Sequence, residues 1–237
     1  MIISLGVAKM PKYGLSVSGD VVEAVERSKG GITAILADGQ GHGQAARKIA
    51  SLVVSRAAAL ICEGARDGAV ARAAHDILFA AKEGKVSCEL VLISADLDTR
   101  TIVISRNTAV PVYVRPSSES KELREVNEPS YPLGTERGRR PQITELPLRP
   151  GLVALATSDG VHDAGLSSNT RFGLEHVRQF ILGDAPIRPS ELAEQILLRA
   201  VSLDKGRPRD DMSVVVLAVS AEEDEHMIRR LSMRIPF

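Results

Sequence analysis

Three short acidic motifs in this sequence each adjoin an apolar run, at a point where a buried strand is expected to begin or end. They are Asp38-Gly39 after Ile32–Ala37, Asp159-Gly160 shortly after Leu152–Ala156, and Asp210-Asp211 before Met212–Val219. The hard divalent cations Mg²⁺ and Mn²⁺ prefer carboxylate, carbonyl and water oxygens as ligands. Strand-end carboxylates from three distant parts of the chain therefore predict a metal centre.

Each motif taken singly has an ordinary alternative. Asp-Gly is common in turns, and a strand that ends in Asp-Gly belongs more often to a hairpin than to a ligand set. The glycines that follow Asp38, by contrast, lack Cβ atoms and let the backbone approach a ligand closely. The set is more specific than its members, because all three motifs lie beside long apolar runs and can converge at one edge of a core.

The same segments resemble the signatures of metal-dependent PP2C-type Ser/Thr protein phosphatases, and most closely those of their bacterial SpoIIE-like branch. The resembling segments are Ser18–Asp20, Asp38–Gly43, Pro132–Gly134, Ser158–Val161, Arg171–Gly173 and Arg209–Val216. They occur in the family's order over nearly the whole chain. The resemblance implies an α+β fold, an αββα four-layer sandwich of two mostly antiparallel sheets flanked by helix pairs.

The resemblance also implies a site for two ions, Mn²⁺ or Mg²⁺. Asp38 would bridge the ions, and the backbone carbonyl of Gly39 would add a ligand to one of them. Asp159 and Asp210 would complete the other ion's site, and Asp20 would serve the ion nearer Gly39. Two ions about 3.5–4 Å apart activate a water molecule and stabilise a phosphoryl group. Water would then attack phosphorus directly, which agrees with the lack of a Cys-x5-Arg phosphatase loop in the sequence.

Several of these assignments have alternatives. Asp210 is favoured over Asp211 because the resemblance places the first aspartate on the metal, whereas the family often has Asn at the second position. Ser18–Asp20 also suits an ordinary turn. Asp163 is expected to cap its loop rather than to reach a metal.

The sequence does not assign the residue that donates a proton to the leaving group or the residue that binds the substrate phosphate. Eukaryotic relatives have a His directly after Asp-Gly, whereas Gln40 stands there in this chain. His42 lies two residues further on, at the expected start of a helix, where it is expected to cap or pack rather than to catalyse. Four arginines are conceivable phosphate ligands, although each is more simply interpreted as solvated surface charge: Arg47, Arg137, Arg139 and Arg140.

Composition agrees with a compact intracellular enzyme. A chain of 237 residues with 44% hydrophobic content can bury one large core, so we expect a single domain over residues 1–237. Lys+Arg and Asp+Glu are balanced at 30 each, which favours neither nucleic acid nor membrane as a partner. No signal peptide and no run of about 18 apolar residues occurs, so a cytoplasmic location is expected. Cys62 and Cys88 are expected to be buried free thiols.

Hydrophobic periodicity predicts strands and helices in blocks rather than in regular alternation, which excludes a doubly wound parallel fold. Strands are expected at Met1–Ala8, Gly14–Val17, Ile32–Ala37, Cys88–Leu97, Arg100–Ser105, Pro111–Arg115, Gln142–Leu148, Leu152–Ala156 and Met212–Val219. Helices are expected at Gly43–Ile61, Asp67–Ala81, Gly173–Leu182 and Pro189–Ser202.

The leading hypothesis is therefore a metal-dependent phosphatase of phosphoserine and phosphothreonine in proteins. A stand-alone catalytic domain of this length resembles the RsbX-like stress-response phosphatases, so the expected substrates are phosphorylated STAS-domain proteins of a bacterial signalling complex. The alternative is a catalytically inactive binding module with the same fold, although the intact ligand positions argue against it. A metal-dependent hydrolase of nucleotides or nucleic acid ranks third, because the sequence has no basic patch and only 3% aromatic residues.

Overall fold

A computed structural model describes residues 1–166, 170–183, 187–222 and 228–235 of the chain. The strands within these ranges are β1 (Ile2–Met10), β2 (Val21–Glu26), β3 (Gly31–Gly39), β4 (Cys88–Asp96), β5 (Thr101–Asn107), β6 (Val112–Arg115), β7 (Arg124–Val126), β8 (Gln142–Pro147), β9 (Val153–Thr157) and β10 (Met212–Ser220). The helices are α1 (Gly43–Cys62), α2 (Asp67–Lys82), α3 (Asp159–His162), α4 (Leu174–Ile181) and α5 (Pro189–Leu203).

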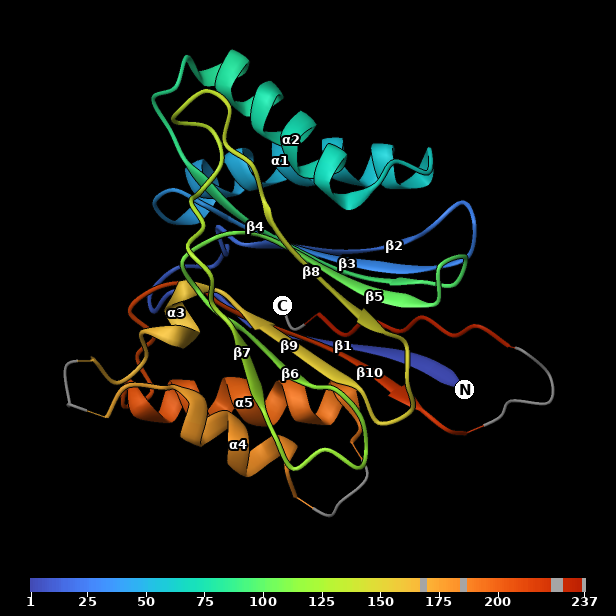
Figure 1. Cartoon of the computed structure of the whole chain (residues 1–237). Helices are drawn as coiled ribbons and strands as arrows, with labels where there is room; N and C mark the ends of the chain where they lie inside the picture. Colours follow the sequence, from blue (N-terminus) through green and yellow to red (C-terminus); the bar gives the residue numbers. More distant parts are fainter. Residues whose placement is uncertain (167–169, 184–186, 223–227, 236–237) are drawn as a thin grey trace.

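The strands form two sheets that stack face to face. One has the order β1-β10-β9-β6-β7 and the other the order β2-β3-β4-β5-β8, and neighbouring strands are antiparallel in both. Helices α1 and α2 cover the outer face of the second sheet, and α4 and α5 cover the outer face of the first (Figure 1). The predicted α+β sandwich of four layers is confirmed.

The core lies in three apolar layers, one between the sheets and one beneath each helix pair. Leu36 and Ile93 from one sheet meet Val215 and Leu217 from the other in the central layer. A strand that is covered on both faces must be apolar on both. β10 meets this requirement, because eight of its nine residues are buried, and it therefore holds the acidic motif at its start in a fixed place.

Helix α1 approaches the end of β3 closely. Its alanines Ala46, Ala50 and Ala57 are fully buried, so small side chains face the sheet. A Cβ atom on Gly39 would lie 2.2 Å from the carbonyl oxygen of Ala46, so only glycine fits this position. The glycine after Asp38 thus brings the start of α1 over the end of the strand.

The structure corrects the sequence-based assignment in places. Gly14–Val17, which we expected to be a strand, consists of turns and bends, and β2 follows it instead. β7 and α3 are three and four residues long and were not predicted, because so short a segment shows no periodicity. Cys88 is buried as expected, but Cys62 is exposed at the end of α1.

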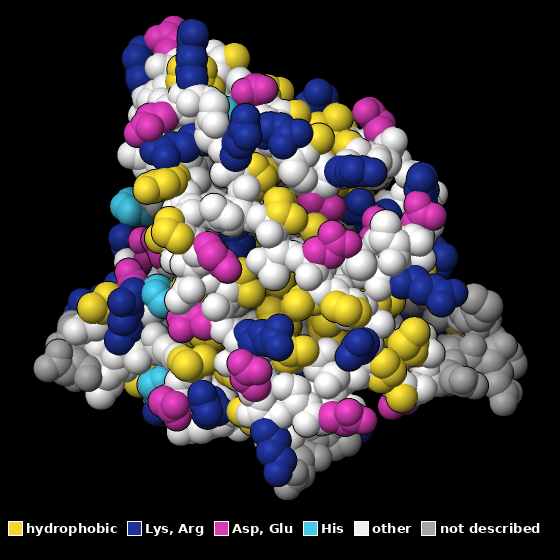
Figure 2. Space-filling model, viewed as in Figure 1, with side chains coloured by type: hydrophobic (Ala, Val, Ile, Leu, Met, Phe, Trp, Pro, Cys, Tyr) yellow, Lys and Arg dark blue, Asp and Glu magenta, His cyan; other side chains and the backbone are white. Residues whose placement is uncertain are grey.

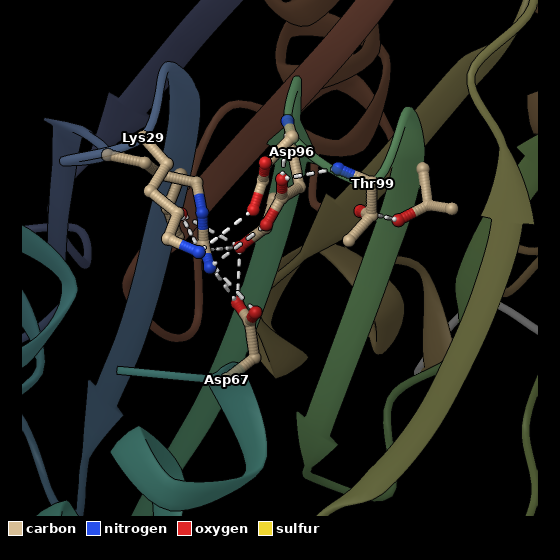
Figure 3. A network of polar contacts seen from close by, with 9 residues as sticks. Lys29, Asp67, Asp96 and Thr99 are labelled. Atoms are coloured by element: carbon tan, nitrogen blue, oxygen red, sulfur yellow. Dashed lines mark hydrogen bonds and ion pairs between the residues drawn. The ribbon is translucent and has the colours of Figure 1, made fainter. Parts of the chain in front are cut away.

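A buried polar network joins the loops at the end of the second sheet remote from α3. The guanidinium of Arg27 lies 3.4 Å from carboxylate oxygens of both Asp67 and Asp96. It also donates hydrogen bonds to the hydroxyls of Thr33 and Ser94, and Ser94 donates to Asp67. Figure 3 shows the group with Asp67 at the start of α2 and Asp96 at the end of β4. The network ties α2 to three strand ends.

Charges of both signs are interspersed over the face of the molecule shown in Figure 2. Among the helices of the described ranges, none is both long and apolar enough to cross a membrane.

Candidate metal centre

Asp38 and Glu89 form one side of an open pocket at the end of the second sheet. Asp38 is the penultimate residue of β3, and its partner across the antiparallel ladder is Glu89, the second residue of β4. Directly opposed residues point to the same face of a sheet, with their Cβ atoms about 4.5–5.5 Å apart. Both carboxylates therefore face the same pocket, which they line.

Asp159 and Asp210 line the same pocket from the first sheet. Asp159 is the first residue of α3, two residues after β9, and Asp210 precedes β10, the antiparallel neighbour of β9. A Cβ atom on Gly160 would lie 2.2 Å from the carbonyl oxygen of Asp211. Glycine after Asp159 therefore lets α3 pack against the entrance of β10, which brings the two acidic motifs together.

Asp20 is fully buried, with a side chain that is 0% exposed. One carboxylate oxygen accepts a hydrogen bond of 2.6 Å from the Ser213 hydroxyl, while the other oxygen, Oδ1, has no hydrogen-bond partner. A buried carboxylate oxygen without a donor is costly unless a cation binds it. Asp20 is not among the residues that line the open pocket, but it is close enough to raise the pKa of Asp38.

Asp210 and Asp211 have different surroundings. The Asp211 carboxylate is 2% exposed and accepts backbone hydrogen bonds from Lys12 (2.9 Å) and Gly19 (2.8 Å). It fixes the loop that leads to Asp20. Asp210 accepts a hydrogen bond from the backbone of Asp211 through one oxygen, at 2.9 Å, and lines the pocket. The position expected to bind metal is thus the one that faces the pocket.

The pocket concentrates negative charge. Burial, and then the carboxylates of Asp20, Asp159 and Glu89, raise the pKa of Asp38 to about 11. Burial raises the pKa of Glu89 to about 7 and that of Asp20 to about 6, although the hydroxyl donors Thr108 and Ser213 oppose these shifts. Of the described residues that line the pocket, none is Lys or Arg.

This donor set suits hard divalent cations. It consists of carboxylate oxygens, it has a buried oxygen without a partner, and the described residues that line the pocket include neither Lys nor Arg, whereas Lys9 lies beside Asp20 outside the pocket. In the described part of the chain, no three acidic, His or Cys side chains already surround one point closely enough to hold an ion. Binding would therefore require the carboxylates to adjust their rotamers around the ions.

The comparisons with known proteins identify the family. The sequence model of the family described as Stage II sporulation protein E (SpoIIE) matches residues 28–220. The chain belongs to the SpoIIE family. Its fold is that of a PP2C-type serine/threonine phosphatase. No curated protein matches the sequence significantly.

Solved structures agree with the SpoIIE family fold. The PP2C domain and a regulatory fragment of SpoIIE from Bacillus subtilis gives a TM-score of 0.77 at 20% identity, over 92% of this chain and 64% of that chain. The SiaA-PP2C domain of Pseudomonas aeruginosa gives 0.73 at 20% identity, over 90% and 86%. A chain from a study of the bacterial stressosome gives 0.66 at 17% identity, over 92% and 100%.

The other polar residues considered in this SpoIIE-family chain have ordinary contacts. Gln40 accepts a hydrogen bond of 2.9 Å from the backbone of Ser87. His42 lines the pocket and lies at the N-terminal cap of α1, without a side-chain cap bond. Asp163 is exposed and forms an ion pair with Arg171.

The four arginines considered as phosphate ligands do not line the pocket. Arg47 donates to the Ser18 carbonyl at 3.4 Å. Arg137 and Arg139 stack over the rings of Phe79 and Tyr131. Arg140 is exposed.

Sequence reasoning missed Glu89. The signal was a single charged residue in the otherwise uncharged stretch 88–95. Its meaning depends on the pairing of β4 with β3, which places it opposite Asp38.

Proposed function

We propose that this chain is an active, metal-dependent phosphatase that hydrolyses phosphoserine and phosphothreonine in proteins. The observation that supports this proposal is the gathering of Asp38, Asp159 and Asp210 in one pocket. The partnerless oxygen of buried Asp20 adds to it. Buried like charges destabilise a fold, so an inactive binding protein would have no reason to keep all four.

In this proposal Asp38 would serve both ions, Mn²⁺ or Mg²⁺. Asp159 and Asp210 would hold one ion, and Asp20 and the carbonyl of Gly39 would hold the other. Two metal ions at such a site would supply an activated water and neutralise phosphoryl oxygens. The chain's own part is to hold the carboxylates at the ends of two sheets, with Asp211 fixing the loop before Asp20. The pocket is open, so a phosphorylated segment of a folded protein can reach it.

The proposed substrates are phosphorylated STAS-domain proteins of a bacterial stress-signalling complex, in the cytoplasm. The support is the fold shared with a chain from the bacterial stressosome study. Candidate STAS-domain proteins encoded near the gene, phosphorylated in vitro, should lose phosphate faster than unrelated phosphoproteins. Equal rates on both groups would contradict the substrate assignment.

The activity is tested with p-nitrophenyl phosphate and a phosphoprotein, each with Mn²⁺ and with EDTA. We expect both substrates to be hydrolysed in the presence of Mn²⁺ and neither to be hydrolysed in EDTA. Asp38→Ala should lower the rate by several orders of magnitude, because it removes the ligand that both ions share. His42→Ala should lower it by about 10-fold or less, whereas loss of a general acid costs about 10²–10⁴-fold.

The outcomes separate the hypotheses. Hydrolysis that survives EDTA would exclude the metal mechanism. A folded protein that neither binds Mn²⁺ nor hydrolyses either substrate would be the inactive binding module. A His42→Ala variant as inactive as Asp38→Ala would make His42 catalytic.

A further inference from the structure

Glu89 lies beside the proposed ligands without belonging to any of the sequence motifs. It is the partner of Asp38 in the β3–β4 ladder and lines the pocket with Asp159 and Asp210. It is also the only charged residue in the stretch 88–95. An apolar residue would continue the pattern of this strand, so a carboxylate at this position needs a reason.

The Glu89 carboxylate is held in place by the loop after β5. The Thr108 hydroxyl donates to its Oε2 at 2.6 Å. Thr108 in turn accepts a hydrogen bond of 2.9 Å from the backbone of Val110. A neutral hydroxyl donor leaves a carboxylate with capacity for further partners. The side chain is therefore oriented but still able to bind a cation.

The loop that holds Glu89 is itself anchored. The side chain of Arg106 is 1% exposed and donates to the carbonyls of Thr108 (3.1 Å) and Val110 (3.3 Å). The charge of Glu89 acts on Arg106 and opposes the lowering of its pKa by burial, but the ion pair of Arg106 is with Glu128, at 4.0 Å. Arg106 thus positions the loop and does not neutralise Glu89 by a direct ion pair.

A small cavity connects Glu89 with Asp38. It measures about 10 Å³, close to the lower limit for one water molecule, and Thr108 and Thr157 also line it. The Thr157 hydroxyl is buried without a hydrogen-bond partner, as is Oδ1 of fully buried Asp20 nearby. These two oxygens can therefore each take a further partner, such as a water molecule or a cation.

We infer that Glu89 is a further ligand of the metal centre, binding Mn²⁺ or Mg²⁺ beside Asp38. The inference rests on the proposed function, because it assumes that cations bind in this pocket. It follows from the shared face of Asp38 and Glu89, the preorganised carboxylate, and the lack of Lys and Arg among the described residues that line the pocket. Carboxylate oxygen is a ligand that both cations prefer.

The test measures Mn²⁺ binding and stability without reference to turnover. Isothermal titration calorimetry with MnCl₂ on the full chain should show about 10-fold or greater loss of affinity in Glu89→Gln, because a charged ligand becomes neutral. In EDTA, Glu89→Gln should melt at the same or a higher temperature than wild type, because one of several repelling charges is gone. The rise in melting temperature on adding Mn²⁺ should shrink.

Two further variants serve as controls. Glu89→Asp keeps the charge and should bind Mn²⁺ more tightly than Glu89→Gln. Glu23→Gln removes an exposed carboxylate from β2 of the same sheet and should leave Mn²⁺ binding unchanged.

The results distinguish the inference from the proposed function. If wild type binds Mn²⁺ and Glu89→Gln binds it equally well but melts lower in EDTA, Glu89 only supports the loop and the inference is wrong. If Glu89→Gln does not fold, Glu89→Asp must bind Mn²⁺ more weakly than wild type, or the inference is again wrong. If wild type binds no Mn²⁺, the proposed function falls and the inference falls with it.

Discussion

The adjacent residues Asp210 and Asp211 should respond differently to the same substitution. Asp211→Asn places an amide NH₂ among two backbone N–H donors, so we expect a loss of about 1–3 kcal/mol in the free energy of unfolding. Asp210→Asn should abolish most activity at nearly wild-type stability, because its side chain faces the pocket. Urea unfolding and single-turnover rates on a phosphoprotein would show this. The reverse pattern would make Asp211 the ligand.

Among single residues, those within sequence motifs could be predicted, whereas those whose position depends on strand pairing could not. Asp38, Asp159 and Asp210 stand in motifs whose order and flanking apolar runs are visible in the sequence, and the structure brings them to one pocket. The structural role of Asp211 was not predictable, because it depends on the loop 12–19, which we expected to contain a strand. Glu89 was missed because its position depends on strand pairing.

Among the elements, the buried pair of Arg27 and Asp67 should contribute strongly to stability. Their side chains are only 9% and 5% exposed, so removal of Asp67 leaves the buried guanidinium with Asp96 as its remaining carboxylate partner. Asp67→Ala should cost about 1–3 kcal/mol of unfolding free energy, because buried donors of Arg27 and Ser94 lose their acceptor. Asp98→Ala, which breaks the exposed pair with Lys29, should cost about 1 kcal/mol or less. Chemical denaturation measures the unfolding free energy of both variants. Equal losses would contradict the larger contribution assigned to the buried pair.

Long elements were predictable and short ones were not. The bounds of α1, α2 and β10 lie within about one residue of the prediction, because many periodic residues define each. α3 has four residues and exists because Gly160 lets it pack against the backbone of Asp211. That contact joins segments some fifty residues apart and leaves only an Asp-Gly in the sequence, which equally suits a hairpin.

For the whole molecule without metal, we expect the free energy of unfolding to fall as the pH rises from about 7 to about 8.5. Burial and neighbouring carboxylates raise the pKa of Asp38 from 3.8 to about 11. In this range the native state keeps a proton that the unfolded chain has released, so the unfolding free energy falls as pH rises, by up to about 1.4 kcal/mol per pH unit. Unfolded histidines are about a quarter protonated at pH 7 and almost neutral at pH 8, so the lowered pKa values of His75, His162 and His176 oppose the trend only near pH 7.

Urea unfolding in EDTA across this range would measure the trend. The matched control is Asp38→Asn, which cannot release that proton, so its unfolding free energy should fall much less with pH, although Glu89, with its pKa raised to about 7, still contributes near pH 7. Excess Mn²⁺ should remove the decline, because cations bind the deprotonated carboxylates. If the unfolding free energy of the wild type fell no more with pH than that of Asp38→Asn, the raised pKa of Asp38 would be contradicted.

The proposed ligands are divided between the layers: Asp38 and Glu89 come from one sheet, and Asp159 and Asp210 adjoin the other. A cation bound by both groups would link the sheets, and only in the folded chain. Ligand at about 100 times its dissociation constant adds about 2.7 kcal/mol to stability by mass action. Under the proposed function, the folded fraction, and with it resistance to cellular proteases, should follow the supply of free metal. Metal starvation would then shorten the lifetime of the protein as well as stop its catalysis.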